Sequence, residues 1–157
     1  MPDSRLPTPD SPARSTRHED WDLRLDAYLR NCTAKPFAWG EHDCCLFACD
    51  AVREMTGIDP AAEFRGRYST RAEAYRLLRR ETGKGDFLEA IGAISETCGF
   101  VSVPVPLARR GDAVAIRDAE DTTALGIVAL DGMRVVVLAP TGLTYYPLVR
   151  AVAAWRI

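Results

Sequence analysis

The spacing of apolar residues divides the chain into a helical first half and a strand-rich second half. Apolar residues recur at three- and four-residue steps over residues 21–32, directly after Asp20, and this spacing predicts a helix with Asp20 as its N-cap. Turn residues then interrupt the pattern, and Asp43 is placed to cap a second helix that runs to about Met55.

Two further helices are predicted from the capping box, in which a side chain accepts a hydrogen bond from the backbone three residues later. Each box precedes a periodic apolar run, and each run stops at a glycine, the residue that most readily ends a helix. The two sets are Thr70 with Glu73 and Gly83, and Asp86 with Glu89 and Gly99.

Beyond Gly99 the apolar pattern changes to short β-branched segments separated by turn residues, which is typical of an antiparallel sheet. Five strands are expected, in the segments 100–105, 111–116, 123–130, 133–139 and 143–148. Segments 111–116 and 125–130 are nearly continuous in apolar residues, so we expect them to be the central strands. The order of elements predicts an α+β fold in which the N-terminal helices pack on one face of a C-terminal sheet.

The domain organisation follows from composition. Residues 1–19 are rich in Pro, Ser, Asp and Arg and poor in apolar residues, so we expect a disordered tail followed by a single domain over residues 20–157. Nothing in the sequence resembles a signal peptide, and no apolar run approaches the roughly 18 residues of a membrane span.

Charge and cysteine content narrow the classes of function. The net charge of −2 gives no attraction to nucleic acid or to anionic lipid, so neither is expected as a partner. The five cysteines are an odd number without a Cys-x-x-Cys motif, which favours free thiols in a reducing compartment over a disulfide scaffold.

The strongest chemical candidate is Cys44, which directly follows the predicted N-cap Asp43. A thiol in the first turn of a helix faces unpaired backbone N–H groups and the positive end of the helix dipole, both of which favour the thiolate. The alternative is that Cys44 is a small core residue, as its neighbours Cys45 and Cys49 are expected to be from their position on one apolar stripe. His42 with these cysteines lacks the two separated ligand pairs of a structural zinc site, so no metal and no cofactor are predicted.

The order of three motifs resembles the NlpC-type cysteine peptidases, a papain-like superfamily that cleaves the stem peptides of peptidoglycan. The motifs are Asp43-Cys44 at a helix start, "GDAVAI" at 111–116, and "LGIVAL" at 125–130. The longer stretch "PFAWGEHDCCLFACDAV" together with "RRGDAVAI" and the terminal "AWRI" is similar to a group of tailed-phage and prophage proteins within that superfamily. The resemblance implies a papain-like NlpC-type fold.

The resemblance also implies roles for single residues. Cys44 matches the nucleophile and Asp43 its partner in the motif, while Trp39, Gly40, Gly111, Asp112 and Gly126 match structural positions around the site. The base of the family should stand at Ala124, and the residue that orients the base should stand near Leu138. Neither alanine nor leucine can transfer a proton.

His42 is the remaining candidate for a base, because the only other histidine, His18, lies in the predicted tail. It could serve Cys44 as a base, or it could be a loop residue that packs against the sheet.

Two interpretations therefore stay open. In the first, the protein is a catalytically degenerate NlpC-like component of a phage tail tip or of tail assembly, with other tail proteins as partners. In the second, it is an active cysteine hydrolase of peptidoglycan in phage entry, with Cys44 and His42 as catalytic residues. The resemblance places either protein in the virion, or in the bacterial cytoplasm during assembly.

Overall fold

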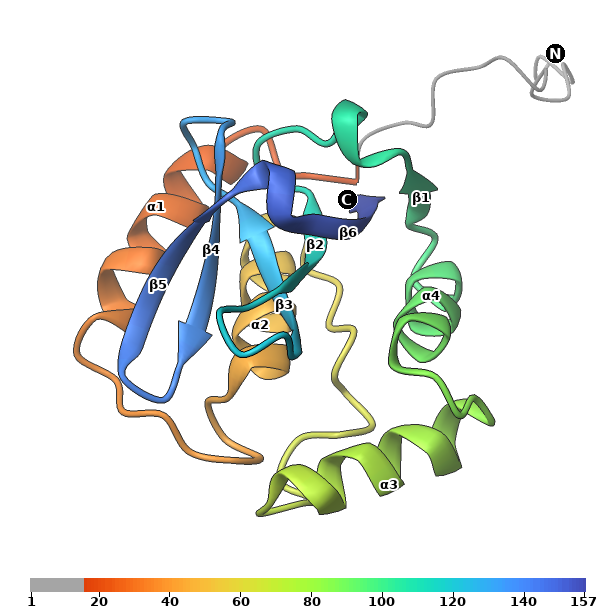
Figure 1. The fold of residues 1–157 in the computed structure, drawn as a ribbon. Coiled ribbons are helices and arrows are strands. Elements are labelled where there is room, and N and C mark those ends of the chain that lie inside the picture. Colours follow the sequence, from red (N-terminus) through yellow and green to blue (C-terminus); the bar gives the residue numbers. More distant parts are fainter. Residues whose placement is uncertain (1–15) are drawn as a thin grey trace, which may run out of the picture.

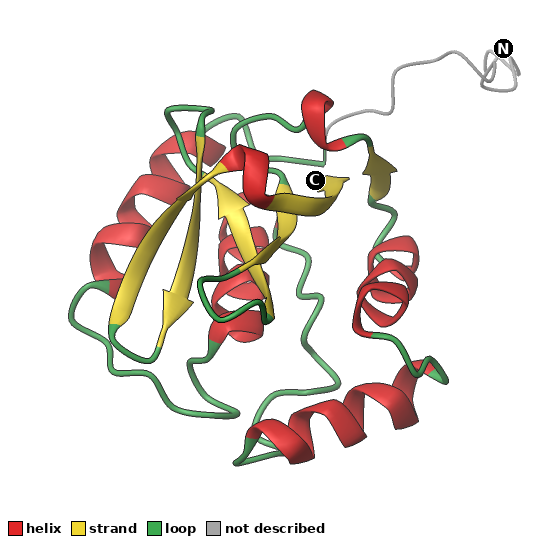
Figure 2. Cartoon of the chain, viewed as in Figure 1, coloured by secondary structure: helices red, strands yellow, loops and turns green. Residues whose placement is uncertain are grey.

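The computed structural model describes residues 16–157, which form four α-helices, six β-strands and two short 3₁₀ helices (Figures 1 and 2). None of these helices is long and apolar enough to cross a membrane. The helices are α1 (Trp21–Cys32), α2 (Cys44–Thr56), α3 (Arg71–Thr82) and α4 (Phe87–Thr97). The other elements are β1 (Val101–Val103), η1 (Val105–Leu107), β2 (Ala113–Arg117), β3 (Thr123–Val128), β4 (Arg134–Ala139), β5 (Gly142–Pro147), η2 (Leu148–Arg150) and β6 (Ala151–Arg156).

The helix starts are those that the capping residues predict. The side chains of Asp43, Thr70 and Asp86 each accept a hydrogen bond from the backbone N–H three residues further on, at the starts of α2, α3 and α4. Asp20 is the N-cap of α1 but its side chain makes no capping hydrogen bond. The local signals for all four helices are therefore confirmed, although the Asp20 side chain accepts a hydrogen bond from Arg24 instead of from a backbone N–H.

The strands form one sheet in the order β1-β6-β2-β3-β4-β5, and all its pairings are antiparallel. The prediction that β2 and β3 are central is confirmed, and both are buried along most of their length. The prediction of five strands is wrong, because residues 151–156 add β6 between β1 and β2. Three of these six residues are alanine, which has weak strand propensity, and tertiary pairing decides the conformation here.

Each face of the sheet contributes to a separate apolar core. On one face, side chains such as Leu125, Ile127 and Val136 pack against α1 and α2, which lie behind the sheet in Figure 1. On the other face, a smaller core that includes Val114 and Val128 is closed by side chains of β1, η1 and η2. The helices α3 and α4 form an arm beside the sheet, in which α3 packs on α4 and α4 contacts β1. Side chains of α4 such as Phe87 and Ile91 also pack against the larger core.

The N-terminal boundary differs from the expected one. Residues 1–15 of the predicted tail lie outside the described residues, but residues 16–19 are described and make specific contacts. Arg17 donates a hydrogen bond to the backbone oxygen of Ile157 at 3.0 Å, and the His18 amide donates to the oxygen of Met55 at 2.8 Å. The packed region therefore begins before Asp20, because Arg17 finds partners that lie far away in the sequence.

Candidate functional site

Asp43 organises the loop that precedes α2. Its side chain is fully buried, and one oxygen accepts the capping bond from the Leu46 amide at 3.0 Å. The other oxygen accepts hydrogen bonds from the Gly40 amide at 2.9 Å and from the Tyr68 hydroxyl at 2.6 Å. Burial, and next the hydrogen bond to Asp43, raise the pKa of Tyr68. Both carboxylate oxygens are thus engaged in holding the chain around the start of α2.

Gly40 and Trp39 shape the same loop. Gly40 has a φ of +80°, and a Cβ atom at this position would lie 2.0 Å from the Tyr68 backbone oxygen. Only glycine allows the two segments to approach so closely. Trp39 packs edge-on against Phe37 with ring centroids 5.1 Å apart, and both side chains line the cavity described below. These two positions are structural parts of the site.

Cys44 is the first residue of α2 and is half-buried. Its Sγ lies 4.0 Å from the Sγ of Cys45. The pKa of the Cys44 thiol is lowered, chiefly because Cys45 can donate a hydrogen bond to its sulfur, while burial and the Asp43 carboxylate oppose the shift. The positive charge of Arg71 acts in the same direction as Cys45. The same contact and burial raise the pKa of Cys45.

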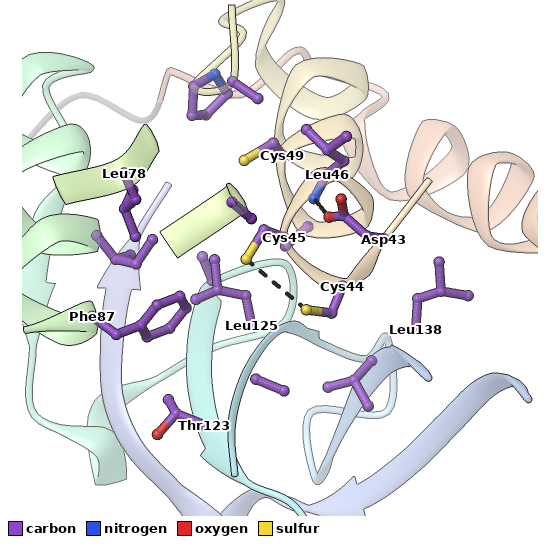
Figure 3. Close-up of a pocket in the computed structure, with 18 of the residues that line it drawn as sticks. Asp43, Cys44, Cys45, Leu46, Cys49, Leu78, Phe87, Thr123, Leu125 and Leu138 are labelled. Carbon is purple, nitrogen blue, oxygen red and sulfur yellow. Dashed lines mark hydrogen bonds between the residues drawn. The ribbon is translucent and has the colours of Figure 1, made fainter. Parts of the chain in front are cut away.

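A cavity of about 260 Å³ opens beside this thiol pair, between α2, the α3–α4 arm and the sheet. Its walls are mostly apolar, and charged side chains stand among them at Arg71, Asp118 and Glu120. In Figure 3 the Cys44 sulfur lies between the side chains of Leu125 and Leu138, while Phe87 and Leu78 face them from the arm. Cys44, Cys45 and Cys49 all line the cavity. The prediction that Cys45 and Cys49 are core residues is therefore only partly right, because their sulfur atoms border this space.

The two positions at which the resemblance implies a base and its orienting group also line the cavity. Ala124 lies in β3 and Leu138 in β4, and α2 packs against both strands. Ala124 is partly packed against the core on the far face of the sheet, whereas Leu125 belongs to the face toward α2. All three aligned positions therefore border one cavity, but only Cys44 and Leu138 belong to the α2 side of the sheet, and Ala124 packs toward the far face.

His42 does not line this cavity. Its side chain is 1% exposed, and both of its ring nitrogens are buried without a hydrogen-bond partner. Its backbone forms an antiparallel bridge with Ala38, with hydrogen bonds of 2.8 and 2.9 Å. Burial, followed by the charge of Lys35, lowers the pKa of the imidazole. The structure thus separates His42 from the space in which a substrate of Cys44 would lie.

Asp112 is the centre of a buried charge cluster at the entry to β2. Its carboxylate is fully buried and accepts hydrogen bonds from Arg17 at 2.6 Å, from the Arg109 amide at 2.8 Å and from Arg156 at 3.2 Å. Asp112 does not line the cavity with Cys44. Its role is to connect the N-terminal segment, the turn before β2 and the end of β6.

Gly111 and Gly126 permit close packing in the same region. At Gly111, with a φ of +83°, a Cβ atom would lie 2.8 Å from the ring of Trp21. At Gly126, a Cβ atom would lie 2.5 Å from the backbone oxygen of Val136 in the neighbouring strand. At both motif positions a side chain would therefore collide with a neighbouring residue, which explains the glycine.

Three contributors to the site escaped the sequence analysis. Tyr68 lies 25 residues after its partner Asp43, in a connector without periodicity, so no local signal pointed to the pair. Arg71 opens α3 and no local motif connects it with Cys44, yet its charge acts on this thiol. Cys45 could have been found from its position next to Cys44, since consecutive residues at the start of a helix can both border a cavity at its N-terminus.

Comparison with known families adds one result. Residues 16–157 match the model of a domain family whose description is "Domain of unknown function (DUF6950)". The chain belongs to this family. No curated protein matches the chain. The match begins at residue 16, before the predicted boundary at Asp20, and agrees with the contacts that Arg17 and His18 make.

Proposed function

We propose that the protein is a papain-like domain of the NlpC type that no longer hydrolyses peptide bonds, and that it serves as a component of a phage tail tip or of tail assembly. The cavity beside Cys44 is retained as a binding site for a neighbouring tail protein or for another ligand. Peptidoglycan is bound weakly or not at all.

The arrangement of the aligned residues supports the papain-like assignment. Cys44 begins a helix that packs on β3 and β4, and the "GDAVAI" and "LGIVAL" motifs form adjacent central strands. Cys44, Ala124 and Leu138 come from three separate elements and line one cavity. A nucleophile, a base and an orienting group need the same kind of convergence.

One observation in particular supports the proposed loss of hydrolysis. Among the described residues that line the cavity there is no imidazole. Cleavage of an amide requires a group that protonates the leaving amine, and this help is worth about 10²- to 10⁴-fold in rate. Three carboxylates border the cavity. Asp43 is fully engaged, one oxygen of Asp118 accepts hydrogen bonds from the amides of Glu120 and Thr122 in its own loop, and Glu120 is exposed on that loop.

The second candidate function is an active cysteine hydrolase of peptidoglycan. The position of Cys44 favours it, because the lowered pKa of this thiol and its access to a cavity are what a nucleophile needs. A base would then have to come from a partner protein or from a rearrangement that exposes His42.

The deciding assay measures soluble stem-peptide fragments released from purified peptidoglycan. We compare the wild type with Cys44→Ser and His42→Ala, and use Cys98→Ser as a matched cysteine control. Thermal melting of each variant verifies that it is folded. We expect the wild type to release no more than Cys44→Ser. Turnover that Cys44→Ser abolishes and Cys98→Ser preserves would establish the hydrolase instead.

The tail assignment has a separate test. In a phage or inducible prophage that carries this coding sequence, we expect mass spectrometry to detect the protein in purified virions or in tail-assembly intermediates. Deletion of the sequence is expected to stop the formation of complete tails, and Cys44→Ser is expected to restore them. Normal tails after the deletion would reject the assignment.

A further inference from the structure

The cavity beside Cys44 has the size and the lining of a site for a hydrocarbon chain. Its volume is about 260 Å³, and its walls include Phe87, Ile91, Leu125 and Leu138. An apolar cavity of about 150 Å³ accommodates benzene, so this one has room for roughly ten carbon atoms. That corresponds to a straight chain of about eight to ten carbons.

The wall of this cavity carries a nucleophile that does not depend on an imidazole. Cys44 lies at the N-terminus of α2, with the thiol of Cys45 at 4.0 Å and the Arg71 side chain among the lining residues. A helix N-terminus, a thiol donor and a nearby cation each stabilise a thiolate. The pKa of Cys44 is accordingly lowered.

A thiolate without an acid catalyst can attack a thioester although it cannot cleave an amide. An amine leaves only when it is protonated, whereas a thiolate leaves unaided because its pKa is close to that of the attacking thiol. The product is again a thioester, and its hydrolysis would require a base that activates water. Since no imidazole lines the cavity in the described chain, this product should persist.

We propose that Cys44 is the acceptor site for a medium-chain acyl group delivered as an activated thioester, with the acyl chain held in the adjacent cavity. In the reaction the Cys44 sulfur bonds to the carbonyl carbon, and the bond from that carbon to the donor sulfur breaks. The donor leaves as a thiolate and takes a proton from water, and no oxidation or reduction occurs. The proposal rests on the proposed loss of hydrolysis, because an active base would remove the acyl group.

The other thiols are poor competitors for the acyl group. Cys32 is buried and its pKa is raised by burial, and burial raises the pKa of Cys49 to about 12. Burial also raises the pKa of Cys98. Cys45 shares the cavity, but the contact with Cys44 and burial raise its pKa. Acylation should therefore be confined to Cys44.

The test uses the full chain and the octanoyl thioester of N-acetylcysteamine, with the acetyl and palmitoyl thioesters in parallel. Intact-mass spectrometry and peptide mapping should find one octanoyl group on Cys44 that neutral hydroxylamine removes. Burial of two methylene groups is worth about tenfold in binding, so octanoyl transfer should exceed acetyl transfer at least about tenfold at low donor concentration. Palmitoyl transfer should be slower than octanoyl transfer, because its chain exceeds the cavity.

Variants separate the parts of the site. Cys44→Ser should lose the adduct, and Cys98→Ser should keep it. Ala74→Phe adds volume at a residue of α3 that lines the cavity, so it should slow octanoyl transfer and leave acetyl transfer nearly unchanged. Cys45→Ala should move the inflection of the rate–pH profile to higher pH. The loss of thiolate at pH 7 is partly offset by the greater nucleophilicity of a more basic thiolate, so the rate should fall by less than the thiolate fraction does.

Three results would overturn the proposal. The first is that the folded wild type gains no adduct from any donor, and this result leaves the proposed function intact. The second is an adduct that survives in Cys44→Ser, or acetyl transfer as fast as octanoyl transfer. The third is steady release of free octanoate that depends on Cys44, since the protein would then possess a deacylating base and the proposed loss of hydrolysis would fail as well.

Discussion

Replacing Asp43 by asparagine tests whether this carboxylate holds the fold together. Asparagine can still accept the capping bond from the Leu46 amide, but its NH₂ group would face two donors, the Gly40 amide and the Tyr68 hydroxyl. Hydrogen bonds to a charged group contribute about 1.5–3 kcal/mol each, so we expect Asp43→Asn to lower the free energy of unfolding by about 3–6 kcal/mol. For a protein of this size that corresponds to a fall in Tm of roughly 6–24 °C.

A double-mutant cycle makes the prediction specific. Tyr68→Phe alone removes one of the two bonds and should lower the free energy of unfolding by about 1.5–3 kcal/mol. In the Asp43→Asn background it should have little further effect, since its partner has already gone. Tyr145→Phe, on a half-exposed strand residue, is the control and should change stability by less than about 0.5 kcal/mol. Additive effects of Asp43→Asn and Tyr68→Phe in urea unfolding would refute the reasoning.

Three further predictions concern other parts of the site. The pKa of buried His42 is lowered, so below about pH 6.5 the unfolded chain binds a proton that the folded chain does not. The free energy of unfolding should therefore decrease as the pH falls below this value. In urea unfolding between pH 7 and 5, His42→Leu should lack this decrease. Gly126→Ala should lower the free energy of unfolding by about 1–3 kcal/mol in thermal melts, because its Cβ would meet the neighbouring strand. Gly92→Ala, where a Cβ meets no atom within 4 Å, should raise it by about 0.5–1 kcal/mol. Equal effects of the two variants would contradict the packing argument. Brief iodoacetamide treatment should label Cys44 before Cys98, and the reverse order in peptide mapping would remove the case for a reactive thiol.

The helices were predictable because their signals are local. Thr70 and Asp86 accept hydrogen bonds from residues only three positions away, so the sequence alone contains the whole interaction. The strand β6 was not predictable in the same way. It exists because residues 151–156 pair with β1 and β2, whose paired residues are 35–55 positions away, and its alanines favour no strand by themselves.

The site was predictable only where a resemblance supplied the long-range information. The position of Cys44 at a helix start follows from Asp43, but its approach to Ala124 and Leu138 requires the packing of α2 on the sheet. The location of His42 was beyond reach, since two residues before Cys44 it could have pointed into the cavity or away from it. The backbone bridge between Ala38 and His42 fixes the loop so that the ring is buried elsewhere.

Asp43 and Cys44 differ in what their presence indicates about function. Asp43 has a sufficient structural reason to be present, since three donors converge on its buried carboxylate, and the fold needs it whether or not the protein is an enzyme. Cys44 has no such reason, because the first turn of α2 would accept serine or alanine there without losing any hydrogen bond on which the loop depends. A thiol with a lowered pKa, open to an apolar cavity whose described lining holds no imidazole, suits acyl transfer between thiols better than peptide hydrolysis. The case for chemistry at this site therefore depends on Cys44 alone, and Cys44→Ser, which should leave the Asp43 network intact, is the variant that separates structure from reactivity.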